Sequence, residues 1–226
     1  MKQVINKNYP ESVLTNQNKE DFWIRCLLGS GKGEEFFTLS IYRAYRDLNR
    51  TIHGLGSVEP NRAKSNHLQL TEQVRESVDC LMNVTFDNQE QFDVKHQKEC
   101  ETLVEKFNQF YSGNPKLHIG QAQKWINMSL KYISALGSER HNGNLANYHF
   151  FHIPIDNIIQ DKLLKHEITP IKTKWSRIND YGIYLQYQNK VRELFINKIP
   201  LDIEFLLFND EEFENDFIQS KTEVNI

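Results

Sequence analysis

The stretch IGQAQKWINMSLKYISAL, residues 119–136, has the most hydrophobic helical pattern in the chain. Gly137 follows it directly and favours a helix end at that point. The stretch therefore predicts a helix at the centre of the hydrophobic core. Its small or apolar side chains recur at three- or four-residue steps and cover a broad face at the period of an α-helix: Ala122, Trp125, Ile126, Ser129, Tyr132, Ile133 and Leu136.

Helical spacing continues over most of the remaining chain, and about seven helices are predicted in total. The clearest of the others covers residues 33–53, where one apolar stripe contains Phe37, Ile41, Ala44, Leu48 and Ile52. Residues 201–208 fit a strand by their alternation and a helix by the proline before them, and we favour a short helix because no partner strand is evident. The further predicted helices are 20–28, 68–84, 89–111, 155–166 and 184–195.

Length and composition fit one all-α domain, a single bundle of helices. A chain of 226 residues with 39% hydrophobic and 25% charged residues is sufficient for one large core and is typical of a globular protein. We expect the helical domain to span residues 1–208 and an acidic, disordered tail to follow over residues 209–226. The tail has a net charge of −5 and suits a basic protein partner, which leaves +2 for residues 1–208. Such a nearly neutral domain does not hold duplex nucleic acid by bulk charge.

The sequence predicts a cytoplasmic protein that does not enter the membrane. The amino terminus lacks the apolar segment of a secretory signal, and no apolar run approaches the roughly 18 residues of a membrane helix. Cys26, Cys80 and Cys100 form neither a C-x-x-C pair nor a disulfide framework. They are therefore expected to be free thiols that are at least half-buried.

Four residues around the end of the 33–53 helix form a candidate catalytic site. Seven steps of 100° return almost to the starting angle, so one continuous helix would place Arg46 and His53 on the same face, with Tyr42 and Asn49 beside them. An imidazole can exchange a proton with a 2′-hydroxyl, and a guanidinium can neutralise charge on a phosphoryl group in the transition state. This face is a candidate for phosphate chemistry, and a solvated helix surface is the other interpretation.

The spacing from Arg46 to His53 resembles the Arg-x4-6-His signature of the HEPN superfamily, and the polar Asp47 directly after Arg46 agrees with it. The resemblance rests on this segment of about eight residues and on the all-helical prediction. It implies a metal-independent endoribonuclease or RNA-binding protein that needs no cofactor, acts as a homodimer and belongs to a bacterial defence or toxin–antitoxin system. In that family's chemistry His53 would be the general acid and base, Arg46 the phosphate clamp, and Asn49 and Tyr42 helpers.

A second polar cluster contains His149, His152 and Asp156, which are ligand types that bind zinc, iron or manganese. Pro154 lies between the histidines and Asp156 and disfavours one helix through all three. We therefore expect the histidines on an extended segment that enters the next helix, with Asp156 in its first turn. A metal-dependent hydrolase is a minor alternative to a chain without metal.

Two clusters of basic residues are candidates for binding anions: Arg43, Arg46 and Arg50, and Lys162, Lys165, Lys172, Lys174 and Arg177. Separately, Lys124 and Asn127 would line a pocket if the 119–136 helix sits deep in the fold, and partial burial would lower the pKa of Lys124 and make it chemically useful. A solvated helix face is the favoured interpretation of each group. The alternative to an RNA-directed function is therefore a non-enzymatic helical interaction or regulatory module.

Overall fold

The computed structural model describes residues 14–29, 35–137, 140 and 145–211. These residues form eight α-helices, joined by short 3-10 turns and loops, and contain no strand. The predicted all-α class and the predicted number of about seven helices are confirmed. The helices are α1 (Asn16–Leu28), α2 (Phe36–Leu48), α3 (Pro60–Asn83), α4 (Gln89–Phe110), α5 (Ile119–Leu136), α6 (Asn157–Leu164), α7 (Tyr181–Leu194) and α8 (Pro200–Phe208).

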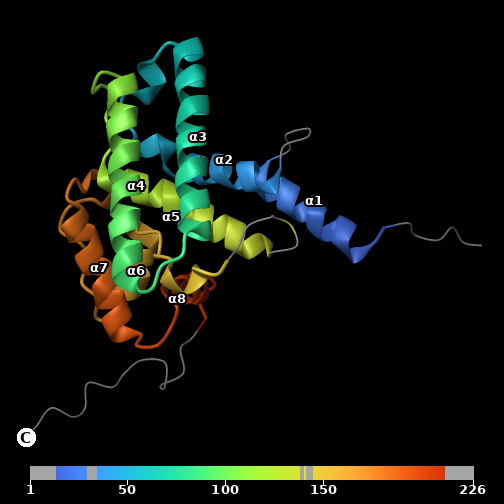
Figure 1. Cartoon of the computed structure of the whole chain (residues 1–226), viewed down its shortest axis with the longest axis vertical. Helices are drawn as coiled ribbons and strands as arrows, with labels where there is room; N and C mark the ends of the chain where they lie inside the picture. Colours follow the sequence, from blue (N-terminus) through green and yellow to red (C-terminus); the bar gives the residue numbers. More distant parts are fainter. Residues whose placement is uncertain (1–13, 30–34, 138–139, 141–144, 212–226) are drawn as a thin grey trace, which may run out of the picture.

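Helix α5 lies at the centre of the bundle, as its sequence predicts. Trp125, Ile126 and Ile133 have no exposed surface, and α5 contacts α2, α3, α4 and the 3-10 turn Trp175–Arg177. The two longest helices, α3 and α4, stand side by side across it (Figure 1). Because other elements cover α5 on several sides, its polar face is buried together with its apolar face.

Helix α1 extends away from the body of the bundle (Figure 1). Leu28 is its one buried residue, and Cys26 on the same helix is exposed. Cys80 is partly buried, Cys100 is buried, and all three thiols are free. The prediction of at least half-buried thiols is therefore wrong for Cys26, because α1 buries little of its surface against the rest of the bundle.

Helix α3 begins eight residues before its predicted start. Residues 60–67 are mostly polar and give no apolar stripe, so the predicted helix began at Leu68. The structure starts it at Pro60, whose ring needs no hydrogen-bond partner in the first turn. The Glu59 carboxylate caps this end by accepting hydrogen bonds from the backbone N–H groups of Asn61 and Arg62 at 2.9 and 2.7 Å.

Helix α2 ends earlier than predicted, and this changes the geometry of the candidate catalytic residues. The α-helix stops at Leu48, a 3-10 turn follows over Asn49–Thr51, and Ile52 is extended. The amide of Gln121 on α5 donates hydrogen bonds to the carbonyl and hydroxyl oxygens of Thr51 at 2.9 and 3.0 Å, which holds the turn in place. The single continuous helix that would carry Arg46 and His53 on one face is therefore absent.

The carboxyl-terminal elements follow the prediction closely. Residues 200–208 form the helix α8, with Pro200 in its first turn, so the helical interpretation of this segment is confirmed. Residues 212–226 of the predicted acidic tail lie outside the described residues. None of the described helices is long and apolar enough to cross a membrane.

Candidate functional site

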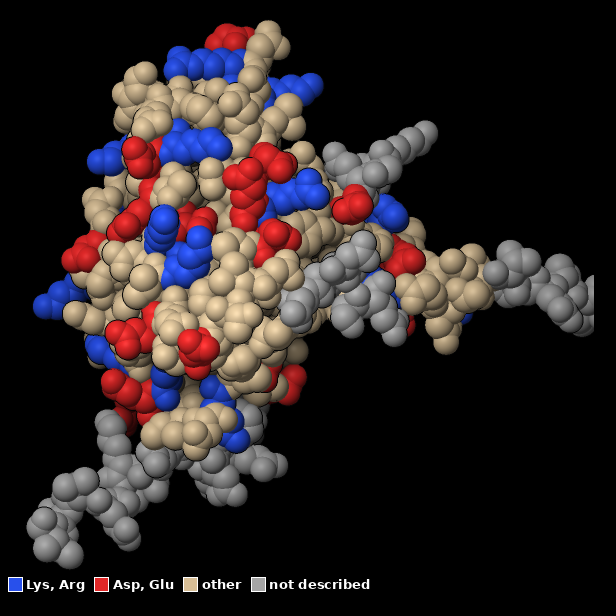
Figure 2. All heavy atoms as spheres, viewed as in Figure 1, with Lys and Arg blue, Asp and Glu red and all other residues tan. Residues whose placement is uncertain are grey.

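A pocket of about 390 Å³ lies between α2, α5, α6 and α8. Five basic side chains and three acidic ones line it, so it is a local site of positive charge in a nearly neutral domain. On the face shown in Figure 2, Lys and Arg are interspersed with Asp and Glu. The charged lining consists of Arg43, Arg46, Arg50, Lys124 and Lys131 with Asp47, Asp156 and Glu204.

The α2 side of the pocket is a row of arginines. Arg43, Arg46 and Arg50 follow at steps of three and four residues, which places them along one side of α2 and the turn after it. Arg43 forms an ion pair with Asp47 at 2.7 Å. Arg46 and Arg50 are exposed and, within the described part of the chain, pair with no carboxylate. Two guanidinium groups at this pocket are thus available to an anion.

The α5 side carries two lysines that are almost completely buried. Lys124 and Lys131 are seven residues apart, 5% and 6% exposed, and form ion pairs with Asp156 and Glu204. Burial raises the pKa of Glu204, although the two lysines act against this shift. These pairs balance charge inside the fold, so attraction for a ligand comes chiefly from the arginines.

A hydroxyl group connects the two sides. Tyr132 on α5 donates a hydrogen bond to the Asp47 carboxylate on α2 at 2.7 Å. Burial and this hydrogen bond raise the pKa of Tyr132, so the hydroxyl stays protonated at neutral pH. The same carboxylate accepts from Arg43, which leaves Asp47 fully engaged by its neighbours.

The remaining wall of the pocket is apolar. Met128 on α5, Ile158 and Ile159 on α6, and Phe208 at the end of α8 line it. Ile158 and Phe208 are 56% and 58% exposed, and both belong to the lining of this pocket. The Lys131 ammonium lies 4.5 Å from the centre of the Phe208 ring. The pocket therefore places exposed apolar surface opposite a row of arginines.

The structure separates the four residues of the predicted catalytic face. Arg46 lines the pocket, whereas Tyr42, Asn49 and His53 are not part of its lining. His53 is exposed in the turn after α2, and Asn49 is partly buried. Tyr42 is partly buried too, with its ring centre 5.7 Å from that of His67. The catalytic role of His53 remains a prediction, without the shared helix face on which it was based.

The three candidate metal ligands point to different places. His149 is exposed and lies against Phe150, with 3.8 Å between ring centres. His152 is fully buried, and Asp156 caps α6 by accepting a hydrogen bond from the Ile159 N–H at 2.9 Å. Both histidines precede α6, as predicted, but His149 lies in the 3-10 turn Tyr148–Phe150 rather than on an extended segment, and Asp156 is the N-cap of α6. The described residues contain no group of three His, Cys, Asp or Glu placed to hold a metal ion.

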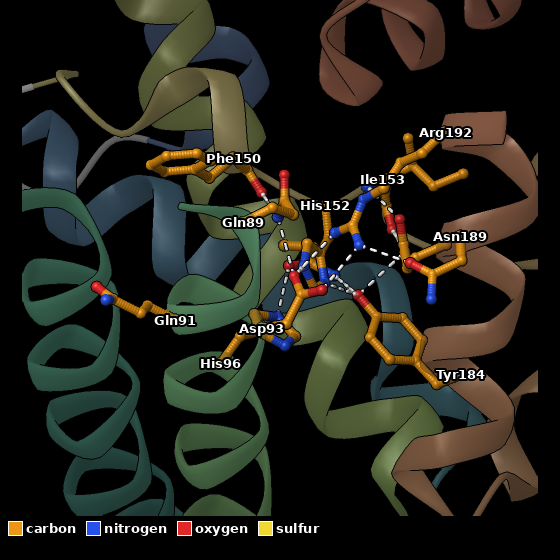
Figure 3. Close-up of polar contacts among 12 residues, drawn as sticks. Gln89, Gln91, Asp93, His96, Phe150, His152, Ile153, Tyr184, Asn189 and Arg192 are labelled. Atoms are coloured by element: carbon orange, nitrogen blue, oxygen red, sulfur yellow. Dashed lines mark hydrogen bonds and ion pairs between the residues drawn. The ribbon is translucent and has the colours of Figure 1, made fainter. Parts of the chain in front are cut away.

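His152 belongs instead to a buried polar network between α4, α5 and α7 (Figure 3). Its two ring nitrogens contact the Asp93 carboxylate at 2.7 Å and the Tyr184 hydroxyl at 2.8 Å. Arg192 reaches the same carboxylate with two hydrogen bonds, at 2.8 and 2.9 Å. Burial acts to raise the pKa of Asp93, but the hydrogen bonds from His152 and Arg192 outweigh it and hold this pKa well below its usual range.

His96 extends this network deeper into the core. Its ring nitrogens contact the Tyr181 hydroxyl at 2.8 Å and the Asn127 side-chain oxygen at 2.9 Å. Burial lowers the pKa of His96 and of His152, so both imidazoles are neutral at neutral pH. Every polar contact of these two rings is to another part of the fold, and we assign the network to stability rather than to ligand binding.

Sequence reasoning identified the components of the pocket but not their association. The arginine cluster and the Lys124 face were separate candidates, and Asn127 is directed to the buried network instead of the pocket. The sequence predicts Asp156 in the first turn of the next helix, with metal binding as a minor alternative, and it gives no signal for Glu204. No sequence signal within any one of these helices shows that α2, α5, α6 and α8 meet.

No family model, curated protein or solved structure matches the chain. These comparisons leave the resemblance to the HEPN superfamily as a prediction.

Proposed function

We propose that the chain binds RNA and that the pocket between α2, α5, α6 and α8 receives its phosphate backbone. The observation that supports this proposal is the exposure of Arg46 and Arg50 at a pocket with five basic and three acidic side chains. A guanidinium group donates paired hydrogen bonds to phosphate oxygens, which a carboxylate-bound arginine such as Arg43 cannot do as freely. The HEPN-like spacing of Arg46 and His53 is the reason for choosing RNA among the polyanions.

The binding test compares the Arg46→Ala/Arg50→Ala double variant with the wild-type chain on a labelled single-stranded RNA. Fluorescence anisotropy at several salt concentrations gives the affinity and its salt dependence. We expect the double variant to lose at least tenfold in affinity, and the slope of log K against log salt to fall by about 1.4, because each lost phosphate contact on a single strand contributes about 0.7.

The matched control for this test is Arg75→Ala. Arg75 lies on α3, outside the pocket lining, and its nearest carboxylate is 3.9 Å away. This variant removes one exposed arginine and should bind RNA like the wild type. Equal RNA affinity of the double variant and the wild type would contradict the proposal. The absence of RNA binding by the wild type would favour the non-enzymatic interaction module.

Cleavage of RNA is a separate part of the proposal, because His53 lies outside the pocket lining. The test incubates mixed cellular RNA with the wild-type chain and with His53→Ala in EDTA, at matched folding by circular dichroism. Cleavage that disappears in the variant supports a HEPN-like, metal-independent ribonuclease with His53 as its acid and base. RNA that remains intact with the wild-type chain rejects the ribonuclease and leaves RNA binding.

A further inference from the structure

The apolar wall of the pocket has a chemical meaning that phosphate binding alone does not explain. A site that recognised only a phosphate group would gain nothing from apolar side chains in its lining, because phosphate oxygens are bound by charged groups and hydrogen-bond donors. Yet Ile158 and Phe208 line the same pocket as Arg46 and Arg50 and are more than half exposed. The expected ligand therefore has an anionic part and a flat or apolar part.

We propose that the pocket binds one unstacked nucleotide, with its phosphate on Arg46 and Arg50 and its base on Phe208. This inference rests on the proposed function and specifies the form of RNA that the site accepts. The aromatic ring of Phe208 supplies a stacking surface, which every base can use. Ile158 extends the apolar wall along α6, next to the place of the base.

The Phe208 ring is held by its contact with Lys131. The Lys131 ammonium lies 4.5 Å from the ring centre, and Lys131 is itself paired with Glu204 in the interior. A cation over one face of an aromatic ring is attracted to that face, and the proposed base would stack on the other. Because Phe208 is 58% exposed, the ring offers a base a surface that is already placed.

The size of the pocket limits the ligand to about one nucleotide. Its volume of about 390 Å³ is at the lower end of the range for small-ligand sites. A double helix keeps its bases stacked inside, so a duplex can present phosphates to the arginines but no base to Phe208. The pocket is therefore expected to prefer single-stranded RNA, or a free nucleoside monophosphate, over a duplex.

The first test measures binding of four ligands by the full chain: a single-stranded RNA, a blunt RNA duplex of the same length, adenosine 5′-monophosphate and ribose 5-phosphate. We expect the single strand to bind at least tenfold more tightly than the duplex. Competition by the monophosphate, but not by ribose 5-phosphate, identifies the base as the recognised part. If the monophosphate fails to compete but the single strand still binds more tightly than the duplex, the site recognises a nucleotide only as part of an RNA strand.

The second test replaces Phe208 by Ala and uses Phe22→Ala as the matched control. Phe22 lies on α1 outside the pocket and is 59% exposed, so the control removes an equally exposed phenylalanine. Phe208→Ala should weaken binding of the single strand about tenfold, as expected for the loss of one stacked base, and leave duplex binding unchanged. Phe22→Ala should change neither affinity. A third variant, Phe208→Leu, keeps the apolar surface and should recover only part of the loss.

The outcomes distinguish this inference from the proposed function. Suppose that Arg46→Ala/Arg50→Ala abolishes RNA binding, that Phe208→Ala binds RNA like the wild type, and that the duplex binds as tightly as the single strand. The nucleotide site is then rejected and phosphate binding remains. If the arginine variant binds RNA normally, the proposed function itself fails.

Discussion

The Nε2 atom of His152 lies 2.7 Å from Oδ1 of Asp93, and both residues are in the interior of the bundle. Arg192 from α7 contacts the same carboxylate, so three segments distant in sequence are joined at one buried charge. A buried carboxylate is tolerated only when its partners compensate for the lost hydration. This network therefore ties the stability of the fold to its state of protonation.

We predict that the protein loses stability as the pH falls below about 6.5. Burial lowers the pKa of His96 and His152 in the folded state, so these rings bind protons more readily after unfolding. Their stabilising contribution is present above the unfolded pKa of about 6.5 and is lost below it, at up to about 1.4 kcal/mol per pH unit for each histidine. Urea denaturation at pH 7, 6 and 5 measures this dependence, and a flat stability across that range would contradict it. His96→Gln removes one of the two histidines, so the slope of unfolding free energy against pH should fall by up to about 1.4 kcal/mol per pH unit.

Asp93→Ala should destabilise the fold by about 3–5 kcal/mol, because the variant leaves the buried His152 and the partly buried Arg192 without their shared acceptor. Asp79→Ala is the control, since Asp79 is exposed on α3 and its loss should cost less than about 0.5 kcal/mol. Chemical denaturation of both variants gives the comparison. Similar costs for the two substitutions would show that the network contributes little.

Hydrophobic spacing predicts correctly the helices that bury one continuous apolar face. The central helix α5 has the predicted bounds because apolar side chains cover one of its faces without interruption. The first two turns of α3 were missed because they are polar, and their start depends on the Glu59 cap. The end of α2 was missed because Gln121, seventy residues from Thr51, holds the 3-10 turn. Spacing along one segment contains no information about such distant partners.

The candidate site shows the same limit. Lys124 and Arg46 were recognised from their own helices, but their common pocket depends on how α2 packs against α5. Asp156 lies 32 residues after Lys124, and Glu204 lies far beyond Lys131, so neither ion pair follows from a helical repeat. The exposed Phe208 gave no signal either, since an apolar residue near a helix end is most simply interpreted as core.

Gly120→Ala should destabilise the protein, although alanine normally favours a helix by about 1 kcal/mol. A Cβ atom at this position would lie 1.7 Å from the carbonyl oxygen of Trp175, and the Gly120 N–H donates to the Ile178 carbonyl at 3.0 Å. Relief of this overlap requires a backbone shift with a cost of about 1–3 kcal/mol or more. Gly56→Ala is the control, because a Cβ atom there meets nothing within 4 Å. If thermal unfolding shows that Gly120→Ala is more stable than the wild type, the close packing of the turn Trp175–Arg177 on α5 is contradicted.

Lys131→Met should destabilise the fold by about 3–5 kcal/mol at neutral pH, because it leaves the buried Glu204 carboxylate without its cation. Burial already raises the pKa of Glu204, and loss of Lys131 removes a group that lowers it. A carboxyl group whose pKa is raised in the folded state destabilises the fold when it is ionised. This loss of stability therefore appears as the pH rises above the pKa of the group in the unfolded chain. The deficit of Lys131→Met relative to wild type should therefore be smaller at pH 5 than at pH 8.

The double variant Lys131→Met/Glu204→Met separates the charge from the packing of this pair. Removing both partners replaces a buried ion pair by apolar side chains, which is often neutral or stabilising. We expect urea denaturation to give the double variant at least the stability of the wild type. The double variant should also lack the loss of stability with rising pH that the raised pKa of Glu204 causes in the wild type. If the single variant's deficit is the same at pH 5 and pH 8, the uncompensated Glu204 charge is not its cause, and the contact of Lys131 with Phe205 and Phe208 becomes the explanation to test.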